Sequence, residues 1–411
     1  MPAIVYFSFA GFLFNNIKFI IMKVNTKAIN SKHDNREGYG ALSFPVYNAV
    51  AYEFDNAEMM SDVFCSRVKL PDYSRVENPT VSYFENRVKD LTGAKKVTAL
   101  NSGMAAICNT LFALSSQGKN IISTKHLFGN TYLLLTKTLK KFGVLTKMCD
   151  LTDIDEVEGN IDGNTCCVYV EIMSNPQLEI APLKKLSDIL KKKRIPLVVD
   201  TTLIPFTRFD ARELGIDIEI VSSTKYISGG GTCLGGLIID YGNYNEFTEC
   251  IEKEMLLNFG AYMTPQVAYM QTLGLETLEC RYSVQSSNAL YLAEKMNALP
   301  AVKFVNYVGL KDNPYYDIAC QQFGETFGAM ITIELESKEK CYGFIDRLQL
   351  IHRATNLFDN RTLAIHPAST IYGTFSSQER EYMDVSETMI RLSIGLEDKE
   401  DLLNDIKQAL Q

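Results

Sequence analysis

The chain has 411 residues, a formal net charge of -8 at pH 7, and a composition that is 46% hydrophobic and 22% charged. This length exceeds the roughly 250–300 residues at which a single hydrophobic core stops growing, so at least two domains are expected. The acidic balance excludes the basic face that nucleic-acid-binding proteins need.

The N-terminal segment 2–14 is almost entirely apolar. It is too short to cross a bilayer, which takes about 20 apolar residues. It also lacks the basic start and the small-residue cleavage site of a signal peptide. We therefore expect residues 1–21 to be a non-native leader from a mis-assigned start, with translation beginning at Met22 and residues 22–70 forming an N-terminal extension. A real targeting segment over 1–21 is the alternative.

Helical and strand patterns alternate from about residue 80. Val81, Phe84, Val88 and Leu91 form one apolar helical face that ends at Gly93. A short strand over 97–100 and a helix starting at Ser102 follow. Further strand-like runs occur at 120–124, 144–149, 166–170, 196–200 and 217–222, with helix-length segments such as 181–193 between them. This α/β order predicts a mostly parallel sheet with helices on both faces.

The C-terminal part has a different order of elements. Residues 234–240 are predicted to be the last, edge strand of the sheet, and 246–300 are predominantly helical. Strand-like segments at 326–336 and 362–366 and an amphipathic helix at 398–410 follow. We therefore expect two domains, 71–245 and a smaller α+β domain over 246–411.

The ten cysteines and four histidines show no metal-ligand spacing. No pair of cysteines is spaced C-x-x-C, and no two histidines have ligand spacing. The sequence thus predicts no metal site, and reduced cysteines used as small apolar residues are typical of the cytoplasm.

Two polar side chains follow neighbouring predicted strands. Asp200 ends the run Leu197-Val-Val, and Lys225 follows the next strand together with the hydroxyls of Ser222 and Thr224. Ligands of parallel sheets bind at the carboxyl ends of strands. A sheltered amine, a carboxylate for a ring nitrogen and hydroxyls for a phosphate are what pyridoxal 5'-phosphate needs. Each residue alone has an ordinary explanation, as a solvated charge or a helix cap, so the prediction depends on the combination.

The segment Ser102-Gly103-Met104 follows a strand and opens a helix. Backbone N–H groups at a helix start bind phosphate, so Gly103 and Met104 are candidates for that role. An ordinary helix cap is the alternative explanation.

Three separated motifs resemble the Cys/Met-metabolism family of pyridoxal-phosphate enzymes: Tyr73-Ser-Arg-Val-Glu-Asn-Pro-Thr80, Ser222-Ser-Thr-Lys225-Tyr and Arg391-Leu-Ser-Ile-Gly-Leu-Glu397. The resemblance implies pyridoxal-phosphate fold type I, with Lys225 bonded to the cofactor. It implies that Tyr73 and Arg75 reach the phosphate of a neighbouring subunit, so that the enzyme is a dimer of active-site-sharing pairs, a homotetramer. It also implies that Arg391 holds the substrate α-carboxylate.

Single positions extend the resemblance. Phe128 falls where the family has an aromatic ring stacked on the cofactor, and Asn175 where it bonds the cofactor's phenolic oxygen. Asp200 and Thr202 fall in the family's D-N-T-F segment, and Asn356 falls at the substrate-binding start of its N-V-G-D segment.

Four short strings resemble the O-acetylhomoserine sulfhydrylase branch: Gly274-Leu-Glu-Thr-Leu, His366-Pro-Ala-Ser-Thr, Asn356-Leu-Phe-Asp and Ile239-Asp-Tyr-Gly-Asn. Phe128 lacks the tyrosine hydroxyl of the lyases, and acetate, a weaker base than a thiolate, leaves without such an acid. Phe358 stands where the family has glycine and is expected to narrow the substrate pocket.

Alternatives remain at two levels. Methionine γ-lyase and the cystathionine γ-synthases and lyases share the scaffold, and the sulfur donor and the acetyl, succinyl or phospho ester stay open. A non-catalytic protein would have no use for Lys225, Asp200, Arg75 and Arg391 together. A nicotinamide dehydrogenase is disfavoured because no G-x-G-x-x-G follows the first strand.

Overall fold

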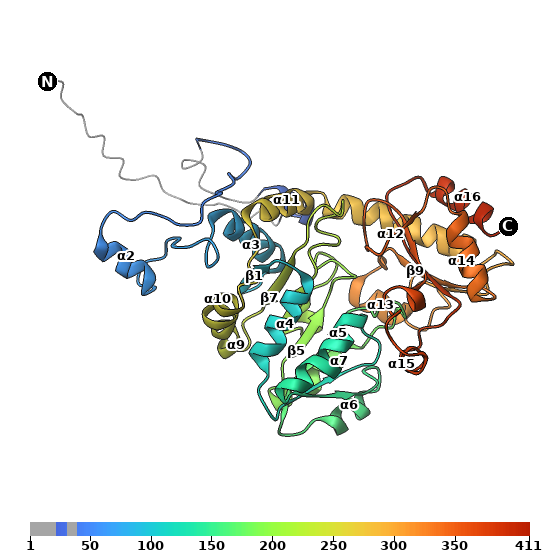
Figure 1. The fold of residues 1–411 in the computed structure, drawn as a ribbon, viewed down its shortest axis with the longest axis horizontal. Coiled ribbons are helices and arrows are strands. Elements are labelled where there is room, and N and C mark those ends of the chain that lie inside the picture. Colours follow the sequence, from blue (N-terminus) through green and yellow to red (C-terminus); the bar gives the residue numbers. More distant parts are fainter. Residues whose placement is uncertain (1–21, 31–38) are drawn as a thin grey trace.

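A seven-stranded sheet forms the centre of the computed structural model, which describes residues 22–30 and 39–411 (Figure 1). The leader expected over 1–21 lies outside the described residues. The strands are β1 (Lys96–Leu100), β2 (Asn120–Ser123), β3 (Leu145–Met148), β4 (Thr165–Glu171), β5 (Leu197–Asp200), β6 (Ile218–Val221) and β7 (Gly236–Asp240), in the order β1-β7-β6-β5-β4-β2-β3. This order and the flanking helices confirm the predicted α/β fold class.

The prediction that 234–240 is an edge strand was wrong. Strand β7 lies between β1 and β6 and pairs antiparallel with both, while the pairs from β6 to β3 are all parallel. Both faces of β7 are buried. Its uninterrupted apolar run Leu237-Ile-Ile is typical of a strand covered on both faces rather than of an edge.

Helices cover both faces of this sheet, so that successive residues of one strand pack into different cores. Val198 and Ile238 pack with helices α4 (Gly103–Leu114) and α9 (Asn245–Cys250), whereas Val199 and Ile239 pack in the larger core. The helices and turns up to β7 are α1 (Val24–Ile29), α2 (Ala57–Phe64), α3 (Pro79–Thr92), α4, α5 (Gly129–Leu133), η1 (Leu134–Thr138), η2 (Leu139–Phe142), α6 (Ile154–Asn160), α7 (Leu183–Lys193) and α8 (Ala211–Leu214).

Local signals explain the limits of the predicted helix after residue 80. The Asn78 side chain accepts from Thr80 N, and Pro79 occupies the first turn of α3, where its missing N–H costs nothing. The helix ends at Gly93, whose φ of 67° lies in the left-handed region. The expected end of this helix is confirmed.

A second, five-stranded sheet follows in the order β10-β11-β12-β9-β8. Its strands are β8 (Phe304–Asn306), β9 (Met330–Glu334), β10 (His352–Arg353), β11 (Leu363–Ile365) and β12 (Met389–Ser393). The elements between and around them are η3 (Ile251–Met255), α10 (Leu256–Phe259), α11 (Pro265–Glu276), α12 (Leu278–Met296), α13 (Tyr316–Phe323), α14 (Lys338–Arg347), η4 (Pro367–Ser369), α15 (Ser377–Tyr382) and α16 (Lys399–Ala409). The sequence did not predict β8, β10 or β12.

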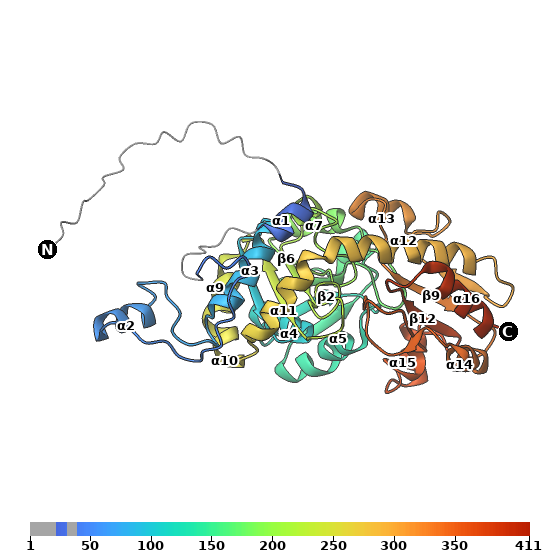
Figure 2. The same ribbon diagram turned by 90° about the horizontal axis from the view of Figure 1, so that it is seen from above.

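Helices α9 to α11 lie with the first sheet rather than with the second (Figures 1 and 2). Helix α11 packs on α3, and Asn101 N donates to Ala261 O. Helices α12, α14 and α16 pack together beside the second sheet. We therefore propose that the second domain starts near α12, later in the chain than the predicted residue 245.

Residues 39–76, which we call the N-terminal arm, extend away from the first sheet (Figure 2). The arm exposes many large apolar side chains: Tyr39, Leu42, Val46, Val50, Met60, Phe64, Leu70, Tyr73 and Val76. Such a concentration of exposed apolar surface is typical of a protein interface. Within the described part of the chain, no helix combines the length and apolar character needed to span a bilayer.

Candidate active site

The predicted polar residues meet at the carboxyl ends of β5 and β6. Asp200 pairs with Ile220 in the sheet register, and Lys225 follows β6. Thr202 N donates to Asp200 Oδ1 over 3.0 Å, and Ser222 N donates to Thr202 Oγ1 over 2.9 Å. These two hydrogen bonds connect the Asp200 turn to the Lys225 loop, as the alternation of strands and helices predicts.

Burial raises the pKa of the Asp200 carboxyl, while hydrogen bonds from Thr202 and Tyr169 oppose the rise. The Tyr169 hydroxyl donates to Asp200 Oδ2 over 3.3 Å. A half-buried carboxylate of this kind has a strong preference for a cationic partner, which a protonated ring nitrogen supplies.

The start of α4 lies against the same loop. A Cβ on Gly103 would come within 2.7 Å of Ser222 Cβ, so only glycine lets the helix start approach this closely. Ser102 caps the helix by accepting from Ala105 N over 3.1 Å. The backbone N–H groups of Gly103 and Met104 are in the first turn, where α-helices leave such donors without intrahelical partners.

Lys225 has the environment of a nucleophilic amine. Its Nζ donates to Asn356 Oδ1 over 2.8 Å. Burial and the nearby positive charge of Arg391 lower the pKa of Lys225 to about 8, against a smaller opposing effect of Asp359. A substantial neutral fraction near pH 8 is what an amine needs to attack a carbonyl carbon.

Arg391 on β12 is a buried cation with no carboxylate partner among the described residues. Its Nη1 donates to Asn175 Oδ1 and its Nη2 to the Thr355 carbonyl, both over 3.1 Å, while Nε has no hydrogen-bond partner. Burial lowers the pKa of Arg391 to about 10, so it stays charged at neutral pH. A buried guanidinium without a counter-ion favours binding of an anionic group.

Sequence reasoning missed Glu171, which closes β4 beside Asp200. Its Oε1 accepts from Phe128 N over 2.7 Å, and its buried Oε2 has no hydrogen-bond partner among the residues that the structure describes. Burial and the charge of Asp200 raise the pKa of Glu171 well above its ordinary value. Its position at the end of an apolar strand could have identified Glu171 from the sequence, because Asp200 was found by the same pattern.

Tyr372 was also missed. Its buried hydroxyl donates toward the carbonyl oxygens of Leu127 and Asn175, each 2.9 Å away. It therefore joins the loop before Phe128 to the loop that carries Asn175. No spacing in the sequence connects these three positions.

The expectation that Phe358 narrows the substrate pocket was wrong. Its side chain is 1% exposed, and its ring stacks on that of Tyr226 with centroids 3.9 Å apart. Phe358 has φ 52°, in the left-handed region that favours glycine. The ring thus packs in the larger core, on the ring of Tyr226, instead of lining a pocket.

Three predicted residues contribute differently from the rest. The Thr224 hydroxyl accepts from Gly235 N over 3.0 Å and donates to Gly235 O over 3.2 Å. Its only proton is therefore bonded to the backbone of Gly235. Arg75 donates to the Leu257 carbonyl over 2.6 Å, and Tyr73 is 42% exposed on the arm. Among the described contacts, neither Tyr73 nor Arg75 reaches Lys225 or Asp200.

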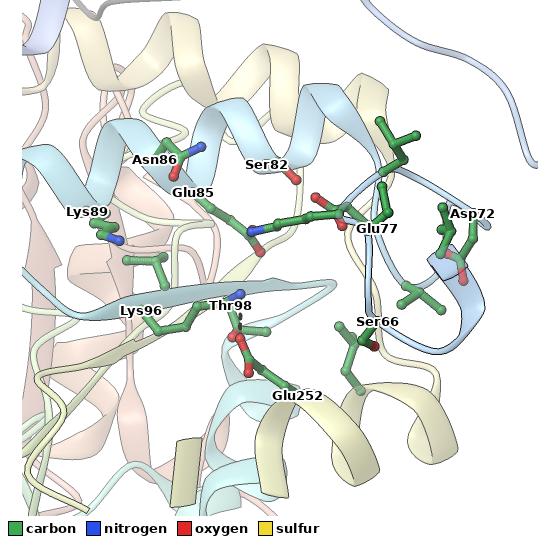
Figure 3. Close-up of a pocket in the computed structure, with 17 residues that line it drawn as sticks. Ser66, Asp72, Glu77, Ser82, Glu85, Asn86, Lys89, Lys96, Thr98 and Glu252 are labelled. Carbon is green, nitrogen blue, oxygen red and sulfur yellow. Dashed lines mark ion pairs between the residues drawn. The ribbon is translucent and has the colours of Figure 1, made fainter. Parts of the chain in front are cut away.

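A cavity of about 500 Å³ lies apart from these residues, between the arm, α3 and β1 (Figure 3). In it Glu85 accepts from Ala99 N over 2.7 Å, and Lys96 pairs with Glu252 over 2.7 Å. None of the predicted site residues lines this cavity. We therefore do not place the predicted active site in this cavity.

The donor set around Lys225 fits pyridoxal phosphate. The lysine amine, the Asp200 carboxylate, the glycine-opened start of α4 and the half-buried Phe128 ring match its aldehyde, ring nitrogen, phosphate and aromatic face. Arg391 Nε and Glu171 Oε2 are orphaned buried polar atoms beside this set. These residues would hold the cofactor and leave an anion-binding position for the substrate.

Comparison with known proteins agrees with this geometry. The Cys/Met metabolism PLP-dependent enzyme family matches residues 25–411. L-methionine gamma-lyase of Fusobacterium nucleatum is 35% identical over 91% of this chain and 94% of its own length.

Two solved structures are also similar. The putative O-acetylhomoserine (thiol)-lyase of Campylobacter jejuni, which carries a pyridoxyl-lysine phosphate, has a TM-score of 0.90 at 31% identity, over 95% of this chain and all of that one. The O-acetylhomoserine sulfhydrylase of Wolinella succinogenes has a TM-score of 0.74 at 42% identity, over 82% of this chain and 99% of that one. This chain therefore belongs to the Cys/Met metabolism family of pyridoxal-phosphate-dependent enzymes, and pyridoxal 5'-phosphate is its cofactor.

Proposed function

We propose that the enzyme joins sulfide to O-acetylhomoserine, giving homocysteine and acetate. The observation that carries the proposal is the identity of Phe128. We propose that its ring stacks on the cofactor, and it lacks the hydroxyl that would protonate a leaving thiolate. Acetate is a much weaker base and leaves without such a donor. The 42% identity to the Wolinella succinogenes sulfhydrylase supports the same choice.

In the proposed reaction Arg391 would bind the substrate α-carboxylate and thereby fix the orientation of the Cα–H bond. Asp200 keeps the ring nitrogen protonated. Pyridoxal phosphate supplies the electron sink that makes the substrate Cα acidic. Lys225 then moves protons at Cα and Cβ, so that the Cγ–O bond breaks, acetate leaves, sulfide bonds to Cγ and the protons return.

The remaining cofactor contacts are proposals of the same kind. Gly103, Met104 and Ser222 would hold the phosphate. Thr224, predicted to do the same, would instead support the loop through its bonds to Gly235, and Thr202 would support Asp200 at the ring. Asn175 would bond the phenolic oxygen, while Asn356 would help to bind the substrate beside Lys225.

Methionine γ-lyase is the second candidate, favoured by the 35% identity to the Fusobacterium nucleatum enzyme. The discriminating experiment gives the cofactor-loaded protein O-acetylhomoserine with sulfide in one arm and methionine in the other. We expect homocysteine in the first arm and no 2-oxobutyrate in the second. Abundant 2-oxobutyrate from methionine would mean that the enzyme is a lyase and that the argument from Phe128 fails.

Lys225→Ala should abolish turnover, and borohydride should no longer attach the cofactor covalently to the protein. Lys185→Ala, at an exposed lysine of α7, is the matched control and should change neither result. Retained turnover in Lys225→Ala would contradict the assignment.

We also propose that active sites are shared between subunits, because the arm that carries Tyr73 and Arg75 is exposed and apolar. The expected assembly is a tetramer made of two such pairs. Co-refolding inactive Lys225→Ala with inactive Arg75→Ala should restore activity, since mixed dimers contain one site with both residues. Absence of any restored activity in proven mixed dimers would contradict the shared site.

A further inference from the structure

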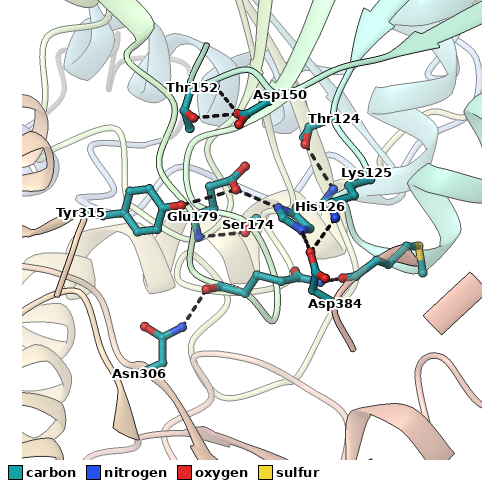
Figure 4. Close-up of polar contacts among 12 residues, drawn as sticks. Thr124, Lys125, His126, Asp150, Thr152, Ser174, Glu179, Asn306, Tyr315 and Asp384 are labelled. Carbon is teal, nitrogen blue, oxygen red and sulfur yellow. Dashed lines mark hydrogen bonds and ion pairs between the residues drawn. The ribbon is translucent and has the colours of Figure 1, made fainter. Parts of the chain in front are cut away.

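His126 lies between two carboxylates that come from different parts of the fold (Figure 4). Its Nδ1 is 2.8 Å from Glu179 Oε2, and its Nε2 is 2.7 Å from Asp384 Oδ2. Ionised carboxylates only accept hydrogen bonds, so both ring nitrogens must carry protons to satisfy this geometry. The arrangement therefore selects the doubly protonated, positively charged imidazole.

The position of His126 in the chain connects this contact to the cofactor. His126 is two residues before Phe128, whose N–H donates to Glu171 at the end of β4. Glu179 is four residues after Asn175, which accepts from Arg391. Asp384 belongs to the turn after α15 in the C-terminal domain and has φ 53°, a conformation that aspartate tolerates better than most residues.

The same two loops are joined a second time. Tyr372 joins the two loops by donating to the carbonyls of Leu127 and Asn175. The hydrogen bond between the side chains of His126 and Glu179 joins the same loops again. Gln177 adds a bond to the C-terminal domain by donating to Met383 O over 2.5 Å. The loops that carry Phe128 and Asn175 are thus held at several points. Tyr372 and Gln177 hold them through neutral hydrogen bonds, whereas the contact at His126 needs a second proton on the imidazole.

We propose that His126 is a positioning residue, which fixes the Phe128 and Asn175 loops against the C-terminal domain by donating from both ring nitrogens to Glu179 and Asp384. The inference rests on the proposed place of Phe128 and Asn175 at the cofactor. It does not depend on which substrate the enzyme uses.

The charges around His126 favour its protonated form. Burial alone would lower the pKa of His126, but the hydrogen bonds and charges of Glu179 and Asp384 outweigh burial and raise the pKa above its ordinary 6.5. Lys125 pairs with Asp384 over 2.7 Å, and the Tyr315 hydroxyl lies 3.4 Å from Glu179 Oε2. The other titratable groups that line the adjoining cavity of about 290 Å³ are Cys149, Asp150, Glu156 and Tyr382.

The sign of the pH dependence follows from this direction. Because the pKa is raised in the folded protein, the contact is complete below pH 6.5 and is lost as the pH rises through the folded-state pKa. The neutral imidazole can then donate to only one of the two carboxylates. The loops lose their fixed position at high pH and keep it at low pH.

The test measures the dissociation constant of pyridoxal phosphate and its visible circular dichroism between pH 6 and pH 9, without substrate. His126→Gln, which can donate to one carboxylate at a time, should bind the cofactor about tenfold more weakly than the wild type at pH 6. The two proteins should converge toward pH 9. Titration of Lys225 and of the cofactor itself is common to both and cancels in the comparison.

Glu179→Gln keeps an acceptor for His126 Nδ1 but removes its charge. It should move the midpoint of the pH dependence down by about 1 pH unit. His352→Asn, at an exposed histidine on β10, is the matched control and should behave as the wild type does. Because these readouts need no substrate, they stay valid if the sulfhydrylase proposal fails.

Three results would overturn the inference. The first is an unchanged cofactor dissociation constant in His126→Gln together with a lowered melting temperature, which would show a merely structural role. The second is a midpoint that does not move in Glu179→Gln. The third is a His352→Asn variant that weakens cofactor binding as much as His126→Gln does.

Discussion

At Phe358 we expect replacement by glycine to leave the protein more stable than replacement by alanine, the reverse of the usual order. Its ring is 1% exposed and stacked on Tyr226, so truncation to alanine should cost about 3–5 kcal/mol of unfolding free energy. Its φ of 52° adds a second effect. An L-residue in this region costs roughly 1–2 kcal/mol, which alanine still incurs and glycine does not.

Glycine also loses more chain entropy on folding than alanine, by about 0.4–1 kcal/mol. The difference between these two effects predicts that Phe358→Gly is more stable than Phe358→Ala by roughly 0.5–1 kcal/mol. Phe344 is the matched control, since it is fully buried inside the helix α14. There the order should be the ordinary one, with Phe344→Gly less stable than Phe344→Ala by about 1 kcal/mol.

Equilibrium urea unfolding of the four cofactor-loaded variants measures these differences as shifts of the midpoint at constant slope. The reasoning is refuted if alanine is the more stable replacement at both positions. In that case the left-handed backbone at Phe358 would not determine the effect of the substitution. A cost below 1 kcal/mol for Phe358→Ala would contradict the burial argument instead.

Three further predictions follow from buried charges. Glu171→Gln keeps the acceptor for Phe128 N and removes an acid whose pKa is already raised by burial, so its cofactor affinity should stay within about threefold of the wild type. Glu171→Ala removes the acceptor and should lose about tenfold in cofactor affinity. Equilibrium titration with the cofactor measures both. Arg391→Lys keeps the positive charge but loses the planar set of N–H donors of the guanidinium, so KM should rise by roughly 10- to 100-fold with a smaller change in kcat. An unchanged KM would exclude Arg391 from substrate binding. Burial raises the pKa of Glu85 from 4.5 to about 7, so its ionisation destabilises the folded state as the pH rises through this window. At 1.36 kcal/mol per pH unit, Glu85→Gln should be more stable than the wild type by up to about 3 kcal/mol at pH 8, with no difference near pH 4.5 in urea unfolding.

Much of the site follows from the sequence because its signals are local. Asn78, Pro79 and Gly93 set the limits of α3 through caps and backbone preference that need no distant contact. The alternation of strands and helices predicts that Asp200 and Lys225 share one edge of the sheet, since consecutive parallel strands end on the same side.

Other features depend on which distant segments come together. Strand β7 lies inside the sheet because it pairs with β1, more than 130 residues earlier in the chain, and its own composition cannot name that neighbour. Arg391 meets Asn175 across 216 residues, and His126 meets Asp384 across 258. Periodicity and capping therefore determined most elements of the first sheet and the placement of Asp200 and Lys225 at one edge of it. Only tertiary packing decided strand order, the left-handed Phe358 and the pairing of buried charges, because these depend on the free energy of contacts between segments that are independent in the sequence.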